Sequence, residues 1–200
     1  MKPCFILFVE GATDEVLFKE IIRYYKNKYK VERKCYVKSF NGVSNYRKVA
    51  GCLNLDYLPR VKKEDYSLSY VLCSYDTDIF EFSCNPPIDW NRIKKEIKVV
   101  VGEKTIVKLI PVKSSIEDWL LSDLNGLGKF LSIKKLSKKS LRGRTGFDKI
   151  QDLFKSHGRV YFKGYESKNI VKILDIEMIV NEHDKDLKPL KEALGIEVKN

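Results

Sequence analysis

The chain has 200 residues, of which 44% are hydrophobic, so it is long and apolar enough for one folded domain with a core, and a disordered chain is excluded. Lys and Arg number 38 against 27 acidic residues, and the net charge of +11 favours a polyanionic partner, either nucleic acid or an anionic membrane surface. Two histidines and five scattered cysteines without a CxxC pair argue against histidine-based catalysis, a zinc site and a disulfide framework.

The first expected elements are a strand and a helix joined by a tight turn. Residues 4–9 (CFILFV) are continuously apolar, which is typical of a strand buried on both faces. A helical spacing of apolar residues begins after Glu10-Gly11-Ala12. Thr13 is expected to cap this helix, and Asp14 falls in its first turn, where the helix dipole favours an acid. Strand, turn and helix in this order open a βαβ unit.

Three further strands are expected, at residues 34–39 (KCYVKS), 69–75 (SYVLCSY) and 105–112 (TIVKLIPV). Residues 44–58 suit either a helix or an irregular insertion. Another helix is expected around residues 90–100, and a capped helix from Ser115. The alternation of these patterns predicts an α/β fold with a mostly parallel sheet flanked by helices.

From about Gly128 the sequence becomes basic. A short strand is expected to return at residues 159–162, followed by helices to the end. We expect residues 1–127 to form the core and residues 128–200 a basic helical extension that completes it in a single compact unit. Six basic residues of this extension are candidates for nucleic-acid binding: Lys134, Lys135, Lys138, Lys139, Arg142 and Arg144. A solvated charged face is the alternative explanation for this run, and it stays open.

Acidic residues follow three of the four expected strands, at the carboxyl end of each: Glu10, the pair Asp76 and Asp78, and Glu117. Ligands of open α/β sheets bind outside the carboxyl ends of the strands. Carboxylates gathered there repel one another, and a hard cation, Mg²⁺ or Mn²⁺, would neutralise them in a chain with almost no histidine. In an extended segment, Asp76 and Asp78 would point to the same side and face one ion.

Each of these acids also has an explanation without a metal. Glu10 can belong to a plain turn, and the pair Asp76 and Asp78 can be loop acids or a helix cap. Asp14, four residues after Glu10, is an ordinary first-turn acid as well as a potential ligand. Glu117 follows Ser114 by three residues and Ser115 by two, so a helix capping box would account for it.

The motifs resemble those of the Toprim family. Val9-Glu10-Gly11-Ala12-Thr13-Asp14 is similar to the first Toprim motif, and Tyr75-Asp76-Thr77-Asp78 to its Asp-x-Asp motif. Ser115-Ile116-Glu117-Asp118-Trp119-Leu120-Leu121 resembles the Ser-x-Glu element of OLD-family (overcoming lysogenization defect) nucleases and small stand-alone Toprim-like proteins. Tyr161-Phe162-Lys163 resembles the basic element that follows it there. The resemblance spans roughly residues 5–163.

The resemblance implies a Toprim-like fold and a nuclease that hydrolyses phosphodiester bonds of DNA or RNA, tRNA included, with two Mg²⁺ or Mn²⁺ ions. It implies that five acids bind the ions: Glu10, Asp76 and Asp78 the first, and Asp14 and Glu117 the second. Lys163 would stabilise charge on the phosphate in the transition state, with Lys149 as the alternative.

The resemblance also implies a role as the toxic effector of an anti-phage defence system, working with an ATPase. The chain has no GxxxxGK[ST] motif, so any ATPase would be a separate protein. Whether the chain forms a homodimer stays open.

Two other functions stay open. A ribosomal-RNA maturation ribonuclease shares the first two motifs. A non-catalytic Toprim module would bind nucleic acid or a partner, although such modules tend to lose the glutamate that is present here as Glu10. A topoisomerase or primase fragment is disfavoured, because neither a nucleophilic-tyrosine domain nor a zinc module is recognisable.

The expected location follows from the cysteines and the N-terminus. No apolar run approaches the roughly 18 residues of a membrane-spanning helix, and the apolar residues 5–9 are too few for a signal peptide. We therefore expect a cytoplasmic protein without a membrane partner. Its thiols are expected to be reduced and mostly buried: Cys4, Cys35, Cys52, Cys73 and Cys84.

Overall fold

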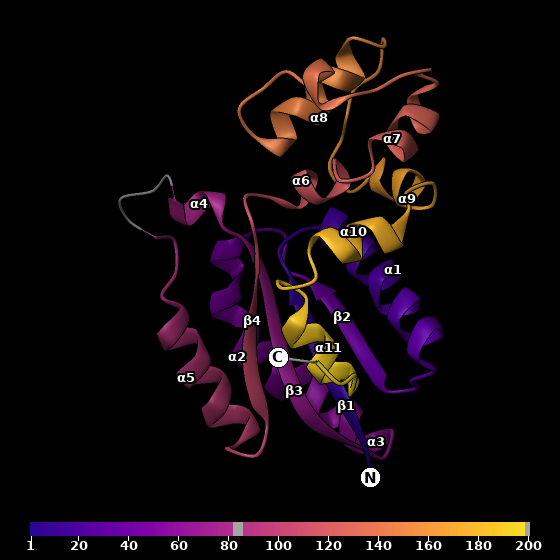
Figure 1. Cartoon of the computed structure of the whole chain (residues 1–200). Coiled ribbons are helices and arrows are strands. Elements are labelled where there is room, and N and C mark those ends of the chain that lie inside the picture. The colour runs from indigo at the N-terminus through magenta and orange to yellow at the C-terminus, as the bar shows by residue number, and fades with distance from the viewer. Residues whose placement is uncertain (82–85, 199–200) are drawn as a thin grey trace.

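A four-stranded parallel sheet in the order β2-β1-β3-β4 forms the centre of the computed structural model, which describes residues 1–81 and 86–198. Its strands are β1 (Lys2–Val9), β2 (Lys34–Ser39), β3 (Tyr66–Asp76) and β4 (Ile106–Val112). Figure 1 shows helices on both faces of the sheet and a further group beyond one end. The expected α/β fold, with a parallel sheet flanked by helices, is confirmed.

The central strand β1 explains why the sheet needs cover on both sides. Its residues 4–9 are all fully buried. Phe5 and Leu7 face one hydrophobic cluster, whereas Cys4 and Ile6 face the other, because successive side chains of a strand alternate between its faces. A continuous apolar run is what this position requires.

The first face of the sheet is covered by α1 (Ala12–Tyr29) and by helices from the C-terminal part of the chain. Leu17 and Ile21 of α1 pack in the same cluster as Phe5 of β1. The C-terminal helices are α9 (Ser167–Val171), α10 (Ile176–Glu182) and α11 (Lys188–Leu194). Helices α9 and α10 contact α1, while α11 contacts β3 and β4.

The second face is covered by a helical run between β2 and β3, and by α5 (Trp90–Val101). For residues 44–58 the helical alternative is therefore the right one. The run changes its winding along its length: 3-10 helix η1 (Val43–Lys48), α2 (Val49–Cys52), π-helix η2 (Leu53–Tyr57) and α3 (Leu58–Lys63). A short helix, α4 (Asp78–Glu81), directly follows β3.

Helices α6 (Ile116–Leu120), α7 (Leu124–Leu131) and α8 (Gly146–Lys155) lie beyond the carboxyl end of the sheet, at the top of Figure 1. The 3-10 turn η3 (Lys138–Ser140) precedes α8. The expected boundary between residues 127 and 128 falls inside α7, and the division into a core and an extension stays a prediction.

Two local expectations were wrong. Thr13 does not cap α1: the N-cap is Gly11 without a side-chain cap bond, and the Thr13 hydroxyl instead accepts a hydrogen bond from the Gly164 N–H. Residues 159–162 do not form a strand, because this segment is held by contacts to helices rather than by a ladder to the sheet. The N–H of Arg159, for example, donates to the carbonyl of Phe154 in α8.

Within residues 1–81 and 86–198, no helix is long and apolar enough to cross a membrane. Four cysteines are free thiols: Cys4 and Cys73 are buried, and Cys35 and Cys52 are partly buried. Cys84 lies outside the described residues.

Candidate functional site

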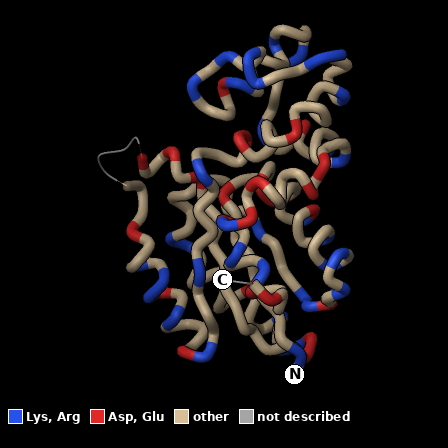
Figure 2. The backbone as a smooth tube through the Cα atoms, viewed as in Figure 1, with Lys and Arg blue, Asp and Glu red and all other residues tan. Residues whose placement is uncertain are grey.

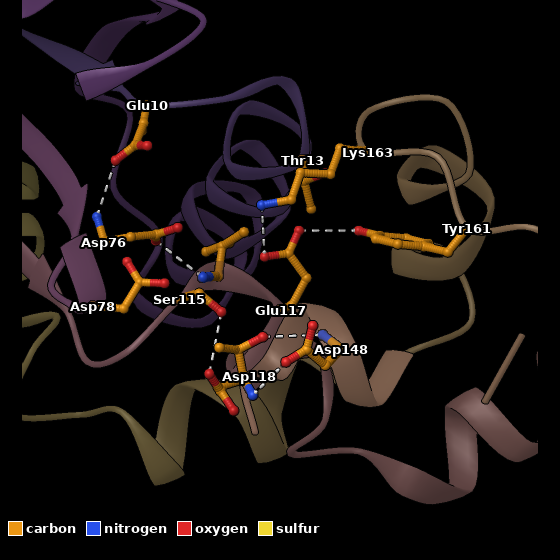
Figure 3. Close-up of polar contacts among 12 residues, drawn as sticks. Glu10, Thr13, Asp76, Asp78, Ser115, Glu117, Asp118, Asp148, Tyr161 and Lys163 are labelled. Atoms are coloured by element: carbon orange, nitrogen blue, oxygen red, sulfur yellow. Dashed lines mark hydrogen bonds and ion pairs between the residues drawn. The ribbon is translucent and has the colours of Figure 1, made fainter. Parts of the chain in front are cut away.

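A pocket of about 310 Å³ opens at the carboxyl end of the sheet. Four carboxylates and one ammonium line it: Glu10, Asp14, Asp76, Glu117 and Lys163. Strand β1 leads into Glu10, β3 ends in Asp76, and α6 and the segment before α9 supply the last two (Figure 3). The parallel topology explains the gathering, because the carboxyl ends of parallel strands meet at one edge.

Glu10 bridges the ends of two neighbouring strands. Its Oε2 accepts a hydrogen bond of 3.3 Å from the backbone N–H of Asp76, and its carbonyl accepts one of 2.9 Å from Gly42. Burial raises the pKa of Glu10, and the bond from Asp76 opposes this shift. The turn after β1 is therefore not a plain solvent turn, since its carboxylate is directed across the sheet edge.

Asp76 ties the end of β3 to the start of α6. It is nearly buried, and its Oδ1 accepts a 3.0 Å hydrogen bond from the Ile116 N–H. Burial, followed by the nearby charges of Asp14 and Glu10, raises its pKa to about 9. The site thus holds a carboxyl group that its surroundings keep from ionising.

Asp14 lies in the first turn of α1 and is almost completely buried. Its Oδ1 has no hydrogen-bond partner. Burial, followed by the charge of Glu10, raises the pKa of Asp14 to about 8. An exposed acid favoured by a helix dipole would keep a low pKa, so the ordinary first-turn explanation does not account for this side chain.

Glu117 is completely buried, and its contacts rule out a capping box. Its Oε1 accepts a 3.4 Å hydrogen bond from the hydroxyl of Tyr161, and its Oε2 lies 3.2 Å from Nζ of Lys163. At this distance Lys163 and Glu117 form an ion pair. The Oε2 atom of Glu117 accepts no hydrogen bond that meets the geometric criteria. Ser115 makes no cap bond and donates instead to Oδ2 of Asp118 at 3.1 Å.

Of the two candidate lysines, Lys163 lines the acidic pocket. Lys149 lies 3.5 Å from Oδ1 of Asp118 and lines a neighbouring pocket that also contains Lys138 and His183. Lys163 therefore lies among the pocket carboxylates and Lys149 beside Asp118, and the role of either lysine toward a phosphate stays a prediction.

Asp78 does not have the geometry that its spacing from Asp76 predicts. The chain leaves the extended conformation after Asp76, and Asp78 begins α4, where its Oδ1 accepts a 2.6 Å hydrogen bond from the next N–H. The expectation of an extended segment through Asp78 was therefore wrong, whereas a shared ion stays a prediction. The Asp78 carboxylate still lies beside that of Asp76 in Figure 3, and its charge contributes to the raised pKa of Asp76.

Three contributors to the pocket were missed. Asn41 and Gly42 line its rim with positive φ angles of 54° and 119°, and the Asn-Gly pair directly after a strand was the available signal. Tyr161 is buried against Glu117. An aromatic residue beside Lys163 gave no signal for this contact, which depends on the tertiary path of the chain.

The donor set fits a hard divalent ion in its chemistry. The pocket offers carboxylate oxygens, one of them a buried Asp14 oxygen without a partner, and the acids outnumber Lys163. Among residues 1–81 and 86–198, however, no group of three or more His, Cys, Asp or Glu side chains is arranged so that it could hold an ion as it stands. Metal binding would therefore require the carboxylates to turn toward one another.

The six expected nucleic-acid-binding residues lie between α7 and α8, in the upper part of Figure 2, where blue segments outnumber red ones. All six side chains are exposed: Lys134, Lys135, Lys138, Lys139, Arg142 and Arg144. Exposure suits both a solvated face and a phosphate-binding surface, so their role stays a prediction.

Comparisons of the chain with protein family models, with curated proteins and with solved structures gave no match. The functional argument therefore depends on the pocket and on the motifs of the sequence.

Proposed function

We propose that this protein is a Mg²⁺- or Mn²⁺-dependent nuclease of Toprim-like fold that hydrolyses phosphodiester bonds at the carboxyl-end pocket. The main support is the convergence of Glu10, Asp14, Asp76 and Glu117 with Lys163 at one sheet edge. A basic chain with a net charge of +11 is suited to a polyanionic substrate, while the acids at the pocket require a cation between them and any phosphate.

The four pocket carboxylates would hold the ions, and Asp78 is close enough to contribute after a change of side-chain conformation. Bound divalent ions would supply Lewis-acid activation of the phosphate and of the attacking water. The buried, partnerless oxygen of Asp14 and the raised pKa values of Asp14 and Asp76 indicate acids that lack a counter-charge, as expected of a site built for one.

Lys163 would donate to a phosphate oxygen on which negative charge develops. Its side chain is about half exposed, so Nζ is accessible from the pocket while Glu117 holds it in place. Tyr161 in turn fixes Glu117 from the other side. Glu117 and Tyr161 are thus positioning residues for the lysine, and a preorganised donor of this kind contributes strongly in a low-dielectric site.

Cleavage of labelled nucleic acid tests this proposal. Purified protein would be incubated with single-stranded DNA, duplex DNA and structured RNA in Mg²⁺, in Mn²⁺ and in EDTA. We expect metal-dependent cleavage of at least one substrate. In Glu10→Gln and in Asp76→Asn the cleavage rate should fall by a factor of roughly 100 or more. Glu64→Gln is the matched control, because Glu64 lies outside the pocket.

Calorimetric titration with Mg²⁺ would separate binding from catalysis. We expect Asp76→Asn to weaken Mg²⁺ binding and Glu64→Gln to leave it unchanged. Binding of metal and nucleic acid without cleavage of any substrate would identify a non-catalytic module. Unchanged metal affinity in both Glu10→Gln and Asp76→Asn would remove this pocket as the metal site.

A further inference from the structure

Two exposed aromatic side chains flank Lys163. Phe162 is 60% exposed and Tyr165 is 77% exposed, more than any other aromatic residue in the described part of the chain. Val160, which is 59% exposed, precedes them. Aromatic rings bury large apolar areas when they have a partner, so an exposed pair in the same turn as a residue of the acidic pocket indicates a contact surface.

The backbone holds this pair in a fixed place. Tyr161, between Val160 and Phe162, is buried against Glu117, so its neighbours are directed outward. The Tyr165 N–H donates to the carbonyl of Phe162 at 3.2 Å, which closes a turn around Lys163. The turn therefore presents both exposed rings to solvent, one residue before and two residues after the lysine that we propose to contact the phosphate.

A second contact anchors the turn to the first turn of α1. The Gly164 N–H donates to Oγ1 of Thr13 at 3.0 Å. Gly164 has a φ of 81°, and a Cβ at this position would lie 2.7 Å from Cβ of Ala12. Only glycine combines this φ with this approach at no steric cost. The aromatic pair is thus attached to the same helix start that carries Asp14.

Cations lie near the turn that carries the pair. A second pocket, of about 470 Å³, is lined by Gly164 and Ala12, and its lining also includes Lys19, Lys168 and Lys172. Glu15 and Glu20 also line it, and Lys19 is paired with Glu15 at 2.5 Å. Lys168 and Lys172 are exposed. Lys168 lies on α9, the helix that follows the turn, and Lys172 comes directly after α9.

We propose that Phe162 and Tyr165 form a stacking platform for unpaired bases, so that the substrate of the pocket is single-stranded nucleic acid or an unpaired stretch of a folded one. This inference rests on the proposed nuclease function and narrows its substrate class. Aromatic rings stack on any base, whereas bases inside a duplex are already stacked on one another. Alternation of rings and cations along a strand path is the arrangement that single-strand binding proteins use.

Binding measured without divalent metal tests the platform separately from catalysis. Fluorescence anisotropy in EDTA, at one fixed salt concentration, would give the Kd for labelled oligo(dT), oligo(U) and a duplex of equal length. We expect the double variant Phe162→Ala with Tyr165→Ala to bind both single strands at least about tenfold more weakly and to bind the duplex within about twofold of wild type.

Tyr29→Ala is the matched control, because Tyr29 is 47% exposed and lies at the far end of α1. It is expected to bind like wild type. Phe162→Trp should retain single-strand affinity, and its indole fluorescence should be quenched when an oligonucleotide stacks on it. This variant also separates loss of stacking from misfolding of the double variant.

The two proposals fail in different ways. Equal single-strand affinity in wild type and the double variant, or no quenching in Phe162→Trp, overturns the platform even if the protein cleaves, and would assign the exposed rings to a protein partner. Aromatic-dependent binding without metal-dependent cleavage overturns the nuclease proposal and leaves the platform in place.

Discussion

The two ends of the parallel sheet treat carboxylates in opposite ways. At the amino end, Glu64 precedes β3 and is surrounded by donors: Nε of Arg60 at 2.8 Å, the Tyr36 hydroxyl at 2.8 Å and Nζ of Lys34 at 3.1 Å. Hydrogen bonds from these groups, that of Arg60 first, lower the pKa of Glu64 to about 2. Two cations thus compensate the charge of one acid, which is how folded proteins usually accommodate a carboxylate.

At the carboxyl end acidic side chains outnumber cationic ones. Glu10, Asp14, Asp76 and Glu117 share a pocket with Lys163, and burial raises the pKa of Asp14 to about 8 and that of Asp76 to about 9. Uncompensated buried acids destabilise a fold, so a sequence selected for stability alone would replace them. The contrast supports our proposal that the acids at the carboxyl end bind a cation.

The largest expected difference between the two ends is in catalysis. Lys163→Gln should slow cleavage roughly 100-fold at saturating Mg²⁺, because it removes the donor that we propose to contact the phosphate. Lys34→Gln removes the matching cation from Glu64 and should leave the cleavage rate within about twofold. Initial rates on a labelled substrate would measure both, and equal losses in the two variants would mean that the lysines affect only folding.

The next effect is on stability without metal. Asp76→Asn should raise the free energy of unfolding by about 1 kcal/mol at neutral pH, because it removes a carboxyl group that must take up a proton on folding, while the amide oxygen can still accept from the Ile116 N–H. In a chain of this size the melting temperature would rise by about 2 to 4 °C. Glu64→Gln should lower the melting temperature instead. A fall in both variants would show that the carboxyl-end acids are already compensated.

The third effect is the slope of stability with pH. The folded-state pKa values of Asp14 and Asp76 are raised to about 8 and 9 from an ordinary value of 3.8, so the folded protein binds more protons than the unfolded chain between these limits. Their contribution is complete below about pH 4 and is lost as the pH rises toward about 9. Glu64 acts oppositely: its contribution is present above its ordinary pKa of 4.5 and is lost as the pH falls toward about 2.

Urea midpoints of the metal-free protein at pH 5, 7 and 9 would detect this slope. We expect the free energy of unfolding to decrease as the pH rises, by less than about 1.4 kcal/mol per pH unit for each proton taken up on folding. The decrease should be smaller in Asp76→Asn. Added Mg²⁺ should restore more stability at pH 9 than at pH 5, because it binds the ionised acids. A profile unchanged by Asp76→Asn would contradict the shifted pKa of this residue.

Much of the sheet edge could be predicted from the sequence. The apolar run before Glu10 and the run that ends near Asp76 indicated buried parallel strands, and parallel strands bring their carboxyl ends together. These two acids were therefore expected in one place, and the pocket contains both. Glu117 required more, because a capping box explained it equally well until its burial and its contact with Lys163 were known.

Contacts between distant segments could not be predicted. Thr13 has a strong local preference for a helix cap, but its hydroxyl is used by Gly164. A strand was expected at residues 159–162, although Tyr161 turns inward to an acid on α6 rather than to a neighbouring strand. Which of Lys149 and Lys163 lies in the acidic pocket also depends on the tertiary path of the chain. No periodicity in the sequence encodes that path.

The hydrogen bond between Thr13 and Gly164 joins positions 151 residues apart, and this separation has a consequence for protein synthesis. Chains leave the ribosome from the N-terminus, so the acids of the pocket are translated well before the lysine that pairs with them. A nascent chain, or one released early, carries Glu10, Asp14 and Asp76 but neither the Lys163 turn nor the rings beside it. The pocket is therefore complete only after residues up to Gly164 have left the ribosome, and the cleavage that we propose for it would be withheld until then.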